Sequence, residues 1–228
     1  MKKKIRSLII SDIHIGVKYN NAKALLELLD KYEFENLFLV GDIIDMTSMM
    51  RRAFWKKAYW KLIKKLVKLS EDVRIVYITG NHDHLLRSFT PFKTGVCEVV
   101  DEFTYGDTLL IHGDKFDRLM YKRRYLYWLG DIGYNLVIWC DKWCCLGGRL
   151  SKKAKRIVKK ASNYLNDFYT LAVKYTQKRD CKRIICGHTH HQERRNIEGI
   201  EYLNCGDFRE STDYIVEDYD GNFTLMGK

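Results

Sequence analysis

The sequence predicts an α/β domain with a central β-sheet covered by helices. Apolar runs typical of strands occur at Lys4–Ser11, Asn36–Val40, Val73–Thr79, Thr108–Ile111 and Arg183–Cys186. Helix-like stretches separate the first three runs, which is the alternation expected of this fold class. Three short strand-like runs close the chain at 201–207, 213–221 and 222–227, with a hairpin turn at Asp220-Gly221. We therefore expect sheets on both sides of a core, with helices outside.

The length and composition favour one folded domain over residues 1–228. A chain of 228 residues can bury one sizeable core. It contains one proline, Pro91, and no Gly/Ser-rich tract, internal repeat or low-complexity segment that would mark a linker. A division into two domains is not expected from these features.

Three stretches have helical periodicity. Arg51–Leu69 carries an apolar stripe with lysines among and opposite it, which predicts a surface helix packed on the sheet with a solvated basic face. Tyr125–Trp143 carries an aromatic-rich stripe, but Asp131, Asn135 and Asp141 interrupt it, so it is not expected to span a membrane. A lysine-rich helix is expected to begin near Ser151, a suitable N-cap.

Charge and cysteine content restrict the partners and the compartment. The chain has 40 Lys+Arg against 29 Asp+Glu, a formal charge of +11 that favours nucleic acid, anionic lipid or a phosphorylated small molecule. The N-terminal apolar run breaks at Asp12, too early for a signal peptide, so we expect a cytoplasmic protein. Cys140, Cys144 and Cys145 are then interpreted as small buried residues, with a structural zinc site as the alternative.

Polar side chains of the same few types follow five of the predicted strands. The strand ends read DIH, GDIID, GNHD, HGD and GHTHH. The carboxyl ends of strands in an α/β sheet are where ligands bind, so these side chains are expected to converge. Six of the seven histidines lie in these clusters, all except His84. Burying so many polar groups without a ligand would be costly, and carboxylate, imidazole and amide donors suit a divalent metal.

The order DxH, GDxxD, GNHD, HGD and GHTH resembles the calcineurin-like metallophosphoesterases. This resemblance implies a β-sandwich core flanked by helices and two divalent ions, with manganese expected first and iron, zinc or magnesium as alternatives. It implies that Asp12, His14 and His190 hold one ion, that Asn81, His112 and His188 hold the other, and that Asp42 bridges both. His82 would contact the scissile phosphate or protonate the leaving oxygen, and Asp83 would orient it.

A narrower resemblance covers almost the whole chain. The stretches LGDIGYNLVIWCDKW, SKKAKRIVKKASNY and YLNCGDFRESTDYIVEDYDG are similar to the branch of UDP-2,3-diacylglucosamine pyrophosphatase of lipid A biosynthesis. The bacterial enzymes of that branch carry Arg where this chain has His82. The resemblance implies a helical lid at about 120–165 that holds acyl chains. The substrate-binding residues implied with it are Asn81, His82, Tyr125, Trp128, Leu136, Lys152 and Lys153.

These observations lead to a di-metal pyrophosphatase that hydrolyses a UDP-linked acylated sugar to UMP and a lipid sugar phosphate. Peripheral contact with the anionic inner face of the membrane is expected with it. The alternative keeps the same metal site but cleaves a phosphodiester in a nucleotide or nucleic acid, which the charge of +11 also suits. A non-enzymatic scaffold is the third reading, and it would need a broken ligand set. The sequence leaves the oligomeric state open.

Overall fold

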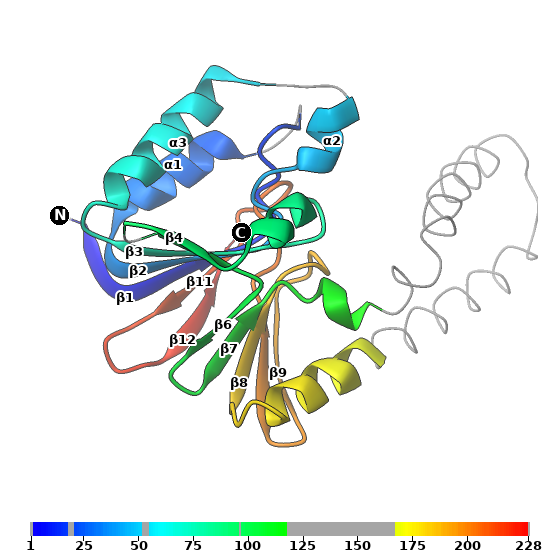
Figure 1. The fold of residues 1–228 in the computed structure, drawn as a ribbon. Helices are drawn as coiled ribbons and strands as arrows, with labels where there is room; N and C mark the ends of the chain where they lie inside the picture. Colours follow the sequence, from blue (N-terminus) through cyan, green and yellow to red (C-terminus); the bar gives the residue numbers. More distant parts are fainter. Residues whose placement is uncertain (1, 18–20, 52–54, 96, 118–166, 228) are drawn as a thin grey trace, which may run out of the picture. The chain divides into compact units, whose positions relative to one another are not determined.

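The structure is a computed structural model that describes residues 2–17, 21–51, 55–95, 97–117 and 167–227. The chain divides into two compact units, residues 1–113 with 175–228, and residues 114–174. Both β-sheets belong to the first unit (Figure 1). The expectation of one domain with a lid at about 120–165 stays a prediction, because residues 118–166 lie outside the described part.

A seven-stranded sheet has the order β12-β11-β1-β2-β3-β5-β4. Its strands are β1 (Lys3–Ile10), β2 (Tyr32–Val40), β3 (Arg74–Ile78), β4 (Phe92–Thr94), β5 (Cys97–Val100), β11 (Tyr214–Glu217) and β12 (Phe223–Met226). Strands β1, β2, β3 and β5 run parallel, and the remaining pairs are antiparallel. The carboxyl ends of β1, β2 and β3 therefore point to the same edge of this sheet.

A five-stranded sheet has the order β6-β7-β8-β10-β9. Its strands are β6 (Glu102–Tyr105), β7 (Thr108–Ile111), β8 (Arg183–Cys186), β9 (Glu193–Ile197) and β10 (Ile200–Asn204). Strands β7, β8 and β10 are parallel to one another, and β6 and β9 are antiparallel edge strands. The ends of β7 and β8 thus share one edge as well.

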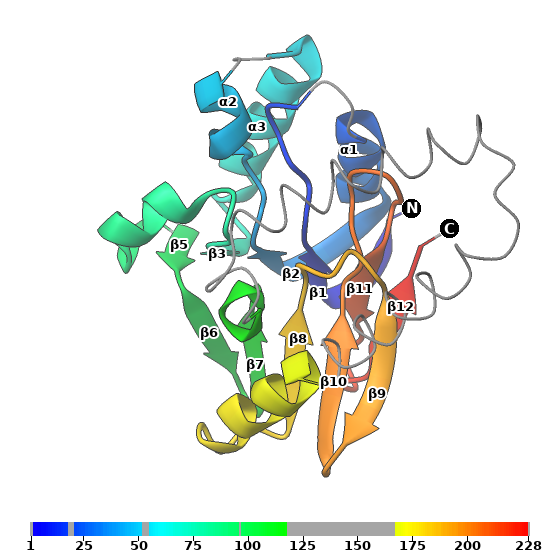
Figure 2. The same cartoon turned by 90° about the vertical axis from the view of Figure 1, so that its right-hand side faces the viewer.

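Two helices cover the outer face of the seven-stranded sheet (Figures 1 and 2). They are α1 (Ala22–Lys31) and α3 (Lys57–Leu69), while α2 (Met46–Arg51), the 3-10 turns η1 (His84–Phe89) and η2 (Asp114–Phe116) and a helix at 167–177 complete the described helical elements. Leu25 of α1 and Leu62 of α3 are buried in the same cluster as Leu8 of β1. The predicted apolar stripe of α3 is confirmed by this packing.

Besides the buried cluster between the larger sheet and the helices, a second buried core lies between the two sheets. Ile9, Phe38 and Val76 of the larger sheet share one buried cluster with residues of the smaller sheet, which are Leu110, Ile185 and Leu203. Their chain neighbours Leu8, Leu37 and Ile75 face the helices instead. Because the central strands are buried on both faces, they read as continuous apolar runs in the sequence. The predicted α/β fold, with sheets around a core and helices outside, is confirmed.

Two element boundaries differ from the sequence expectation. Strand β2 begins at Tyr32 and not at Asn36, and its first residues alternate between buried and exposed, with Glu33 and Glu35 pointing outward. The helix expected from Arg51 begins at Lys57, because the backbone at Lys56 is extended, and Arg51 itself ends α2. Both boundaries lie next to charged residues: Glu33 and Glu35 stand in the early part of β2, and Lys56 precedes α3.

Several predicted features lie outside the described residues. They are the helices expected at Tyr125–Trp143 and from Ser151, the cysteines Cys140, Cys144 and Cys145, and the lid. Within the part of the chain that the structure describes, no helix combines the length and the apolar character needed to cross a bilayer.

Candidate metal centre

The loops that follow the predicted strand ends are hydrogen-bonded to one another. The Asp12 amide donates to the Gly41 carbonyl (3.1 Å), and the His14 amide donates to the Asp42 carbonyl (2.9 Å). The Gly187 amide donates to the His112 carbonyl (3.0 Å), which joins the ends of β7 and β8. These contacts fix the loops that carry the expected metal ligands.

Five of the expected ligands have a left-handed backbone. The φ angles are +52° for Asp12, +50° for His14, +53° for Asp42, +67° for His188 and +55° for His190. A non-glycine residue in this conformation costs about 1–3 kcal/mol and persists where its surroundings fix it. Such residues concentrate at functional sites, so the backbone independently indicates that these loops form one.

Two glycines of the motifs are required by close packing. A Cβ atom on Gly80 would overlap with the carboxylate and the backbone nitrogen of Asp42. A Cβ atom on Gly41 would overlap with the ring of His112. The glycine that opens GNHD and the glycine that opens GDIID therefore let side chains from other strands approach their own strand ends.

The first donor set consists of Asp12, His14 and His190. Asp12 Oδ1 lies 3.2 Å from His190 Nε2 and 3.8 Å from His14 Nε2. One ligand atom from each residue can be chosen so that all three lie within 4.8 Å of one another. Asp12 and His14 are buried, whereas the side chain of His190 is partly exposed. This set has the size of a cation site that opens to solvent on one side.

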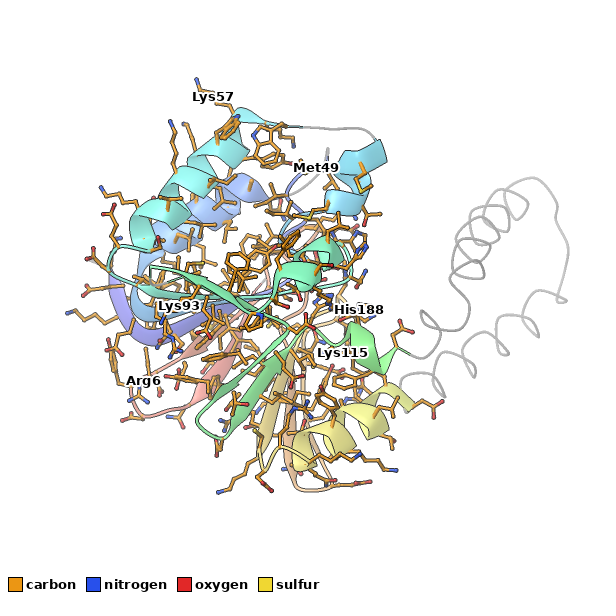
Figure 3. The ribbon with its side chains drawn as sticks, in the orientation of Figure 1. Arg6, Met49, Lys57, Lys93, Lys115 and His188 are labelled. Atoms are coloured by element: carbon orange, nitrogen blue, oxygen red, sulfur yellow. The ribbon has the colours of Figure 1, made fainter. Side chains whose placement is uncertain are left out.

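The second donor set consists of Asn81, His112 and His188. Asn81 Oδ1 lies 3.3 Å from His112 Nε2 and 3.1 Å from His188 Nδ1. Asp42 stands between the sets, because its Oδ2 atom is 3.3 Å from His112 Nε2 and 3.9 Å from His14 Nε2. Figure 3 labels His188, which follows β8 in the chain. The structure thus brings all seven expected ligands together.

The donor atoms fit a divalent cation. Asp12, Asp42 and Asp45 are buried carboxylates within one cluster of imidazoles. Asp12 Oδ1 is buried, and His190 Nε2 at 3.2 Å is not aligned for a hydrogen bond with it. Burial alone would raise the pKa of Asp12 and of Asp42, but attraction to His112 and neighbouring histidines outweighs it and lowers both pKa values. Ionised carboxylates with imidazole and amide donors suit divalent metals of intermediate hardness.

Outer contacts fix which ring nitrogen each buried histidine presents. His112 Nδ1 lies 3.0 Å from the Val40 carbonyl and donates to it, which leaves Nε2 as the ligand atom toward Asp42. His14 Nδ1 lies 3.2 Å from Asp45 Oδ2, so its Nε2 faces Asp12. A carboxylate or carbonyl behind a histidine is the usual way to orient a metal ligand.

His82 lies beside the donor sets without belonging to the seven expected ligands. Its Nδ1 atom is 3.1 Å from Asp45 Oδ2, and its side chain is 35% exposed. Burial alone would lower the pKa of His82, but the neighbouring carboxylates of Asp45 and Asp42 outweigh it and raise the pKa. The site therefore holds a partly exposed imidazole whose protonated form is stabilised by neighbouring carboxylates.

Asp83 does not orient His82, which corrects the sequence expectation. Its carboxylate accepts hydrogen bonds from the Ile43 amide (3.0 Å), the Tyr77 hydroxyl (2.6 Å) and the Gly80 amide. Burial, followed by repulsion from Asp42, raises the pKa of Asp83. Asp83 ties the GNHD loop to the GDIID loop, and Asp45 is the carboxylate next to the His82 ring.

Two further contributors were absent from the expected ligand set. Asp45 serves both His14 and His82, and the GDxxD spacing was the signal for it. The loop after β10 supports Asp12, because the Phe208 amide donates to the Asp12 carbonyl (3.2 Å) and Ser11 Oγ donates to the Gly206 carbonyl (3.1 Å). No local sequence motif indicates the contribution of the loop after β10. The expected substrate-binding residues Tyr125, Trp128, Leu136, Lys152 and Lys153 lie outside the described residues.

Comparison with solved structures found similarities of low sequence identity. The chain is 11% identical to Vps29 from Chaetomium thermophilum, with 100% of this chain and 96% of that one covered and a TM-score of 0.49. It is 13% identical to an archaeal phosphodiesterase, with coverage of 97% and 99% and a TM-score of 0.44. It is 15% identical to a predicted phosphoesterase from Streptococcus pneumoniae, with coverage of 98% of each chain and a TM-score of 0.40. No curated protein matches the chain.

The family comparison is decisive because it covers most of the sequence. The profile described as calcineurin-like phosphoesterase matches residues 5–192. That range begins in β1 and ends just after the GHTHH cluster, so it contains all seven expected ligands together with Asp45 and His82. The chain belongs to the calcineurin-like phosphoesterase family.

Proposed function

We propose that the chain is a hydrolase that uses two divalent ions to cleave a phosphoric ester or pyrophosphate. The position of Asp42 carries this proposal. Its Oδ2 atom lies within 3.3 Å of His112 Nε2 in one donor set and 3.9 Å of His14 Nε2 in the other. A carboxylate shared in this way suits two ions about 3.5–4 Å apart, the spacing of enzymes that clamp both oxygens of a phosphoryl displacement.

The donor sets assign a role to each ligand. Asp12, His14 and His190 would hold one ion, Asn81, His112 and His188 the other, and Asp42 both. When bound, such ions lower the pKa of water and polarise the phosphoryl group, which makes hydrolysis possible near neutral pH. The mixed oxygen and nitrogen donors favour manganese, with iron, zinc and magnesium as alternatives.

His82 would protonate the leaving oxygen. Its ring is partly exposed, its pKa is raised, and Asp45 lies 3.1 Å from Nδ1, so Nε2 is the atom left to face a substrate. His82→Asn should keep the metal content of the wild-type protein but lower turnover by about 10²- to 10⁴-fold, the usual contribution of a general acid. A loss of bound metal in this variant would show that His82 is a ligand.

The proposed substrate is a UDP-linked acylated sugar such as UDP-2,3-diacylglucosamine. Water would add to one phosphorus of the pyrophosphate and break the bridging P–O bond, giving UMP and a lipid sugar phosphate. The proposal is supported by two stretches, LGDIGYNLVIWCDKW and YLNCGDFRESTDYIVEDYDG, that resemble the UDP-2,3-diacylglucosamine pyrophosphatase branch. Asn81 and His82 would contact the pyrophosphate, and Tyr125, Trp128, Leu136, Lys152 and Lys153 would contact the rest of the substrate.

A product assay distinguishes this substrate from the alternative. Purified protein with manganese is given UDP-2,3-diacylglucosamine, a nucleotide diester and a small aryl phosphate in parallel. Release of UMP from the first substrate, lost with chelator and with Asp42→Ala, is the expected result. Cleavage of the diester without UMP release would replace the glycolipid by a nucleotide or nucleic-acid phosphodiester, which the net charge of +11 favours.

The proposed lid has a test of its own. The pair Trp128→Ser with Leu136→Ser should lower turnover of the acylated substrate and leave the aryl phosphate unaffected, because acyl binding depends on apolar burial. The pair Lys152→Gln with Lys153→Gln serves as the charge comparison. Equal losses on both substrates would assign Trp128 and Leu136 to packing alone.

A further inference from the structure

Helix α3 presents a second apolar stripe on its outer face. Trp60 is 56% exposed and Val67 is 62% exposed, and Ile63 lies between them at half burial. Residues at i, i+3 and i+7 share one face of a helix. The adjoining face carries Tyr59 and Leu62, which are buried. Trp60 contacts Trp55, with ring centroids 5.4 Å apart, but more than half of its surface stays exposed.

A row of lysines runs beside this stripe. The segment Lys57–Leu69 contains five lysines and no acidic residue. Lys57, Lys61, Lys64 and Lys68 follow one another at helical spacing and are all exposed, and Figure 3 shows Lys57 projecting outward from α3. Lys65 points elsewhere, toward Asp30 at 2.5 Å. The outer surface of α3 is thus apolar along one line and cationic along the next.

The two lines together form a shallow groove. It has a volume of about 410 Å³ and is lined by Trp60, Ile63, Lys64, Val67, Lys68 and Glu71. Its lining combines indole and aliphatic side chains with two lysines. Glu71 contributes the single carboxylate of the lining and follows the end of the helix.

We propose that this face of α3 docks on an anionic lipid bilayer. An indole prefers the headgroup region, aliphatic side chains enter the acyl boundary, and lysines attract anionic headgroups. The outer face of α3 offers all three in one segment. The inference concerns a surface that shares no residue with the metal centre, so it stands whatever substrate the metal centre takes.

Nucleic acid is the competing partner for a cationic helix, and the apolar stripe argues against it. Binding to a phosphate backbone depends on charge and single-strand binding adds base stacking on aromatic rings. Ile63 and Val67 serve neither interaction, yet they are central to the exposed stripe. A bilayer uses the aliphatic stripe and the lysine row together, which favours the lipid surface.

Vesicle flotation with the full chain tests the proposal. Vesicles of phosphatidylcholine alone are compared with vesicles that also contain phosphatidylglycerol, at low and high salt. The wild-type protein should float with the anionic vesicles and be released by salt. The fourfold change of Lys57, Lys61, Lys64 and Lys68 to Gln should weaken this binding by about 10-fold or more. Trp60→Ser with Val67→Ser should weaken binding to the same vesicles without altering net charge.

Matched variants control for net charge and for loss of apolar surface. Lys3, Lys93, Lys178 and Lys182 are exposed lysines outside α3, and changing these four to Gln removes the same charge. Phe89→Ser with Phe92→Ser removes exposed apolar surface elsewhere. Both controls should float like the wild-type protein. All variants should retain the wild-type melting temperature and aryl phosphate turnover, which separates docking from folding and from the chemistry of the metal centre.

Three results would overturn the proposal. One is wild-type protein that stays unbound with anionic vesicles. Another is equal binding by the α3 variants and their controls. The third is an α3 variant that binds vesicles normally but loses binding to an oligonucleotide duplex, which would assign the lysine row to nucleic acid. Failure of the glycolipid assay would leave vesicle binding unaffected, so the two proposals are distinguishable.

Discussion

Asp45 Oδ2 lies 3.1 Å from His82 Nδ1, although the two residues follow different strands. The same oxygen lies 3.2 Å from His14 Nδ1, and Asp45 Oδ1 accepts a hydrogen bond from the Ser48 amide at 2.6 Å. One buried carboxylate therefore positions an expected metal ligand and the expected general acid. This arrangement couples the geometry of the metal set to the protonation of His82.

Asp45→Asn should lower turnover of an aryl phosphate by about 10- to 100-fold, the usual effect of losing an outer contact of a metal site. It should also lower the pKa of His82, because Asp45 is one of the charges that raise it. If His82 acts as an acid, the alkaline limb of the rate profile moves to lower pH. Kinetics measured across pH with a fixed manganese concentration check both effects.

Asp83→Asn is the comparison for Asp45→Asn. Asp83 accepts from the amides of Ile43 and Gly80, so its replacement should reduce stability by loosening two loops, and the pH at which activity falls should stay in place. An unchanged pH profile for Asp45→Asn, or an equal shift for both variants, would show that Asp45 does not specifically raise the pKa of His82.

Metal content should respond differently to the two classes of ligand substitution. Asn81→Ala removes a donor of one set only, so about one of two bound ions should be lost. Asp42→Ala removes the carboxylate between the sets and should reduce both. Both variants should lose nearly all activity. Elemental analysis after reconstitution and gel filtration provides the measurement.

Asp30→Ala serves as the control for a lost carboxylate, because the Asp30 side chain is 61% exposed and pairs with Lys65 on the surface. It should bind metal as the wild-type protein does. Full occupancy in Asp42→Ala would mean that the donor sets act separately and that Asp42 is not shared.

The left-handed backbone at His190 should make glycine more stabilising than alanine at that position. His190 has a φ of +55°, where a Cβ atom is unfavourable and glycine is not. In protein treated with chelator, His190→Gly should exceed His190→Ala in unfolding free energy by about 1 kcal/mol. Both variants lose the same imidazole, so the difference isolates the backbone. Urea denaturation measures it, and a more stable alanine variant would contradict a strained native conformation.

The main parts of the site could be predicted because strand direction brings chain-distant residues together. Asp12, Asp42 and Asn81 each follow a buried parallel strand, so the sheet alone places them at one edge. His112 and His188 do the same in the second sheet. The pairing of Asp45 with His82 could not be predicted in this way, because it depends on the left-handed turn at Asp42 that redirects the loop.

Other features depend on tertiary contacts that cannot be predicted from the hydrophobic periodicity of the sequence. The helical pattern of α3 shows an apolar residue at Trp60, but only the structure shows that 56% of it stays exposed and that Tyr59 beside it is buried. Strand β9 was not expected, because Glu193, Arg194 and Arg195 carry no apolar alternation. It forms by pairing with β10 at the edge of the sheet.

We expect the ionised Glu201 carboxylate, away from the metal centre, to stabilise the fold in a way that is lost in acid. Its side chain is 19% exposed and accepts a hydrogen bond from Arg183 Nε, and its Oε1 atom lies 2.5 Å from Arg194 Nη2. Burial alone would raise the pKa of Glu201, but Arg183 and Arg194 outweigh it and lower the pKa below its ordinary 4.5. A carboxyl whose pKa is lowered by folding stabilises the protein above its unfolded pKa, and this contribution disappears as the pH falls through the folded pKa.

Glu201→Gln should therefore lower the unfolding free energy by about 1–2 kcal/mol at neutral pH, toward the low end for hydrogen bonds to charged groups because solvent partly screens this contact. The difference from the wild-type protein should shrink as the pH falls below about 4.5, where the unfolded chain begins to bind the proton. Urea denaturation of chelator-treated protein at several pH values measures it without interference from metal release. Glu33→Gln is the control, because Glu33 and Lys4 form an ion pair with both side chains mostly exposed, and such pairs contribute little. A deficit in Glu201→Gln that persists unchanged into acid would mean that the loss comes from packing and that the charge of Glu201 adds nothing.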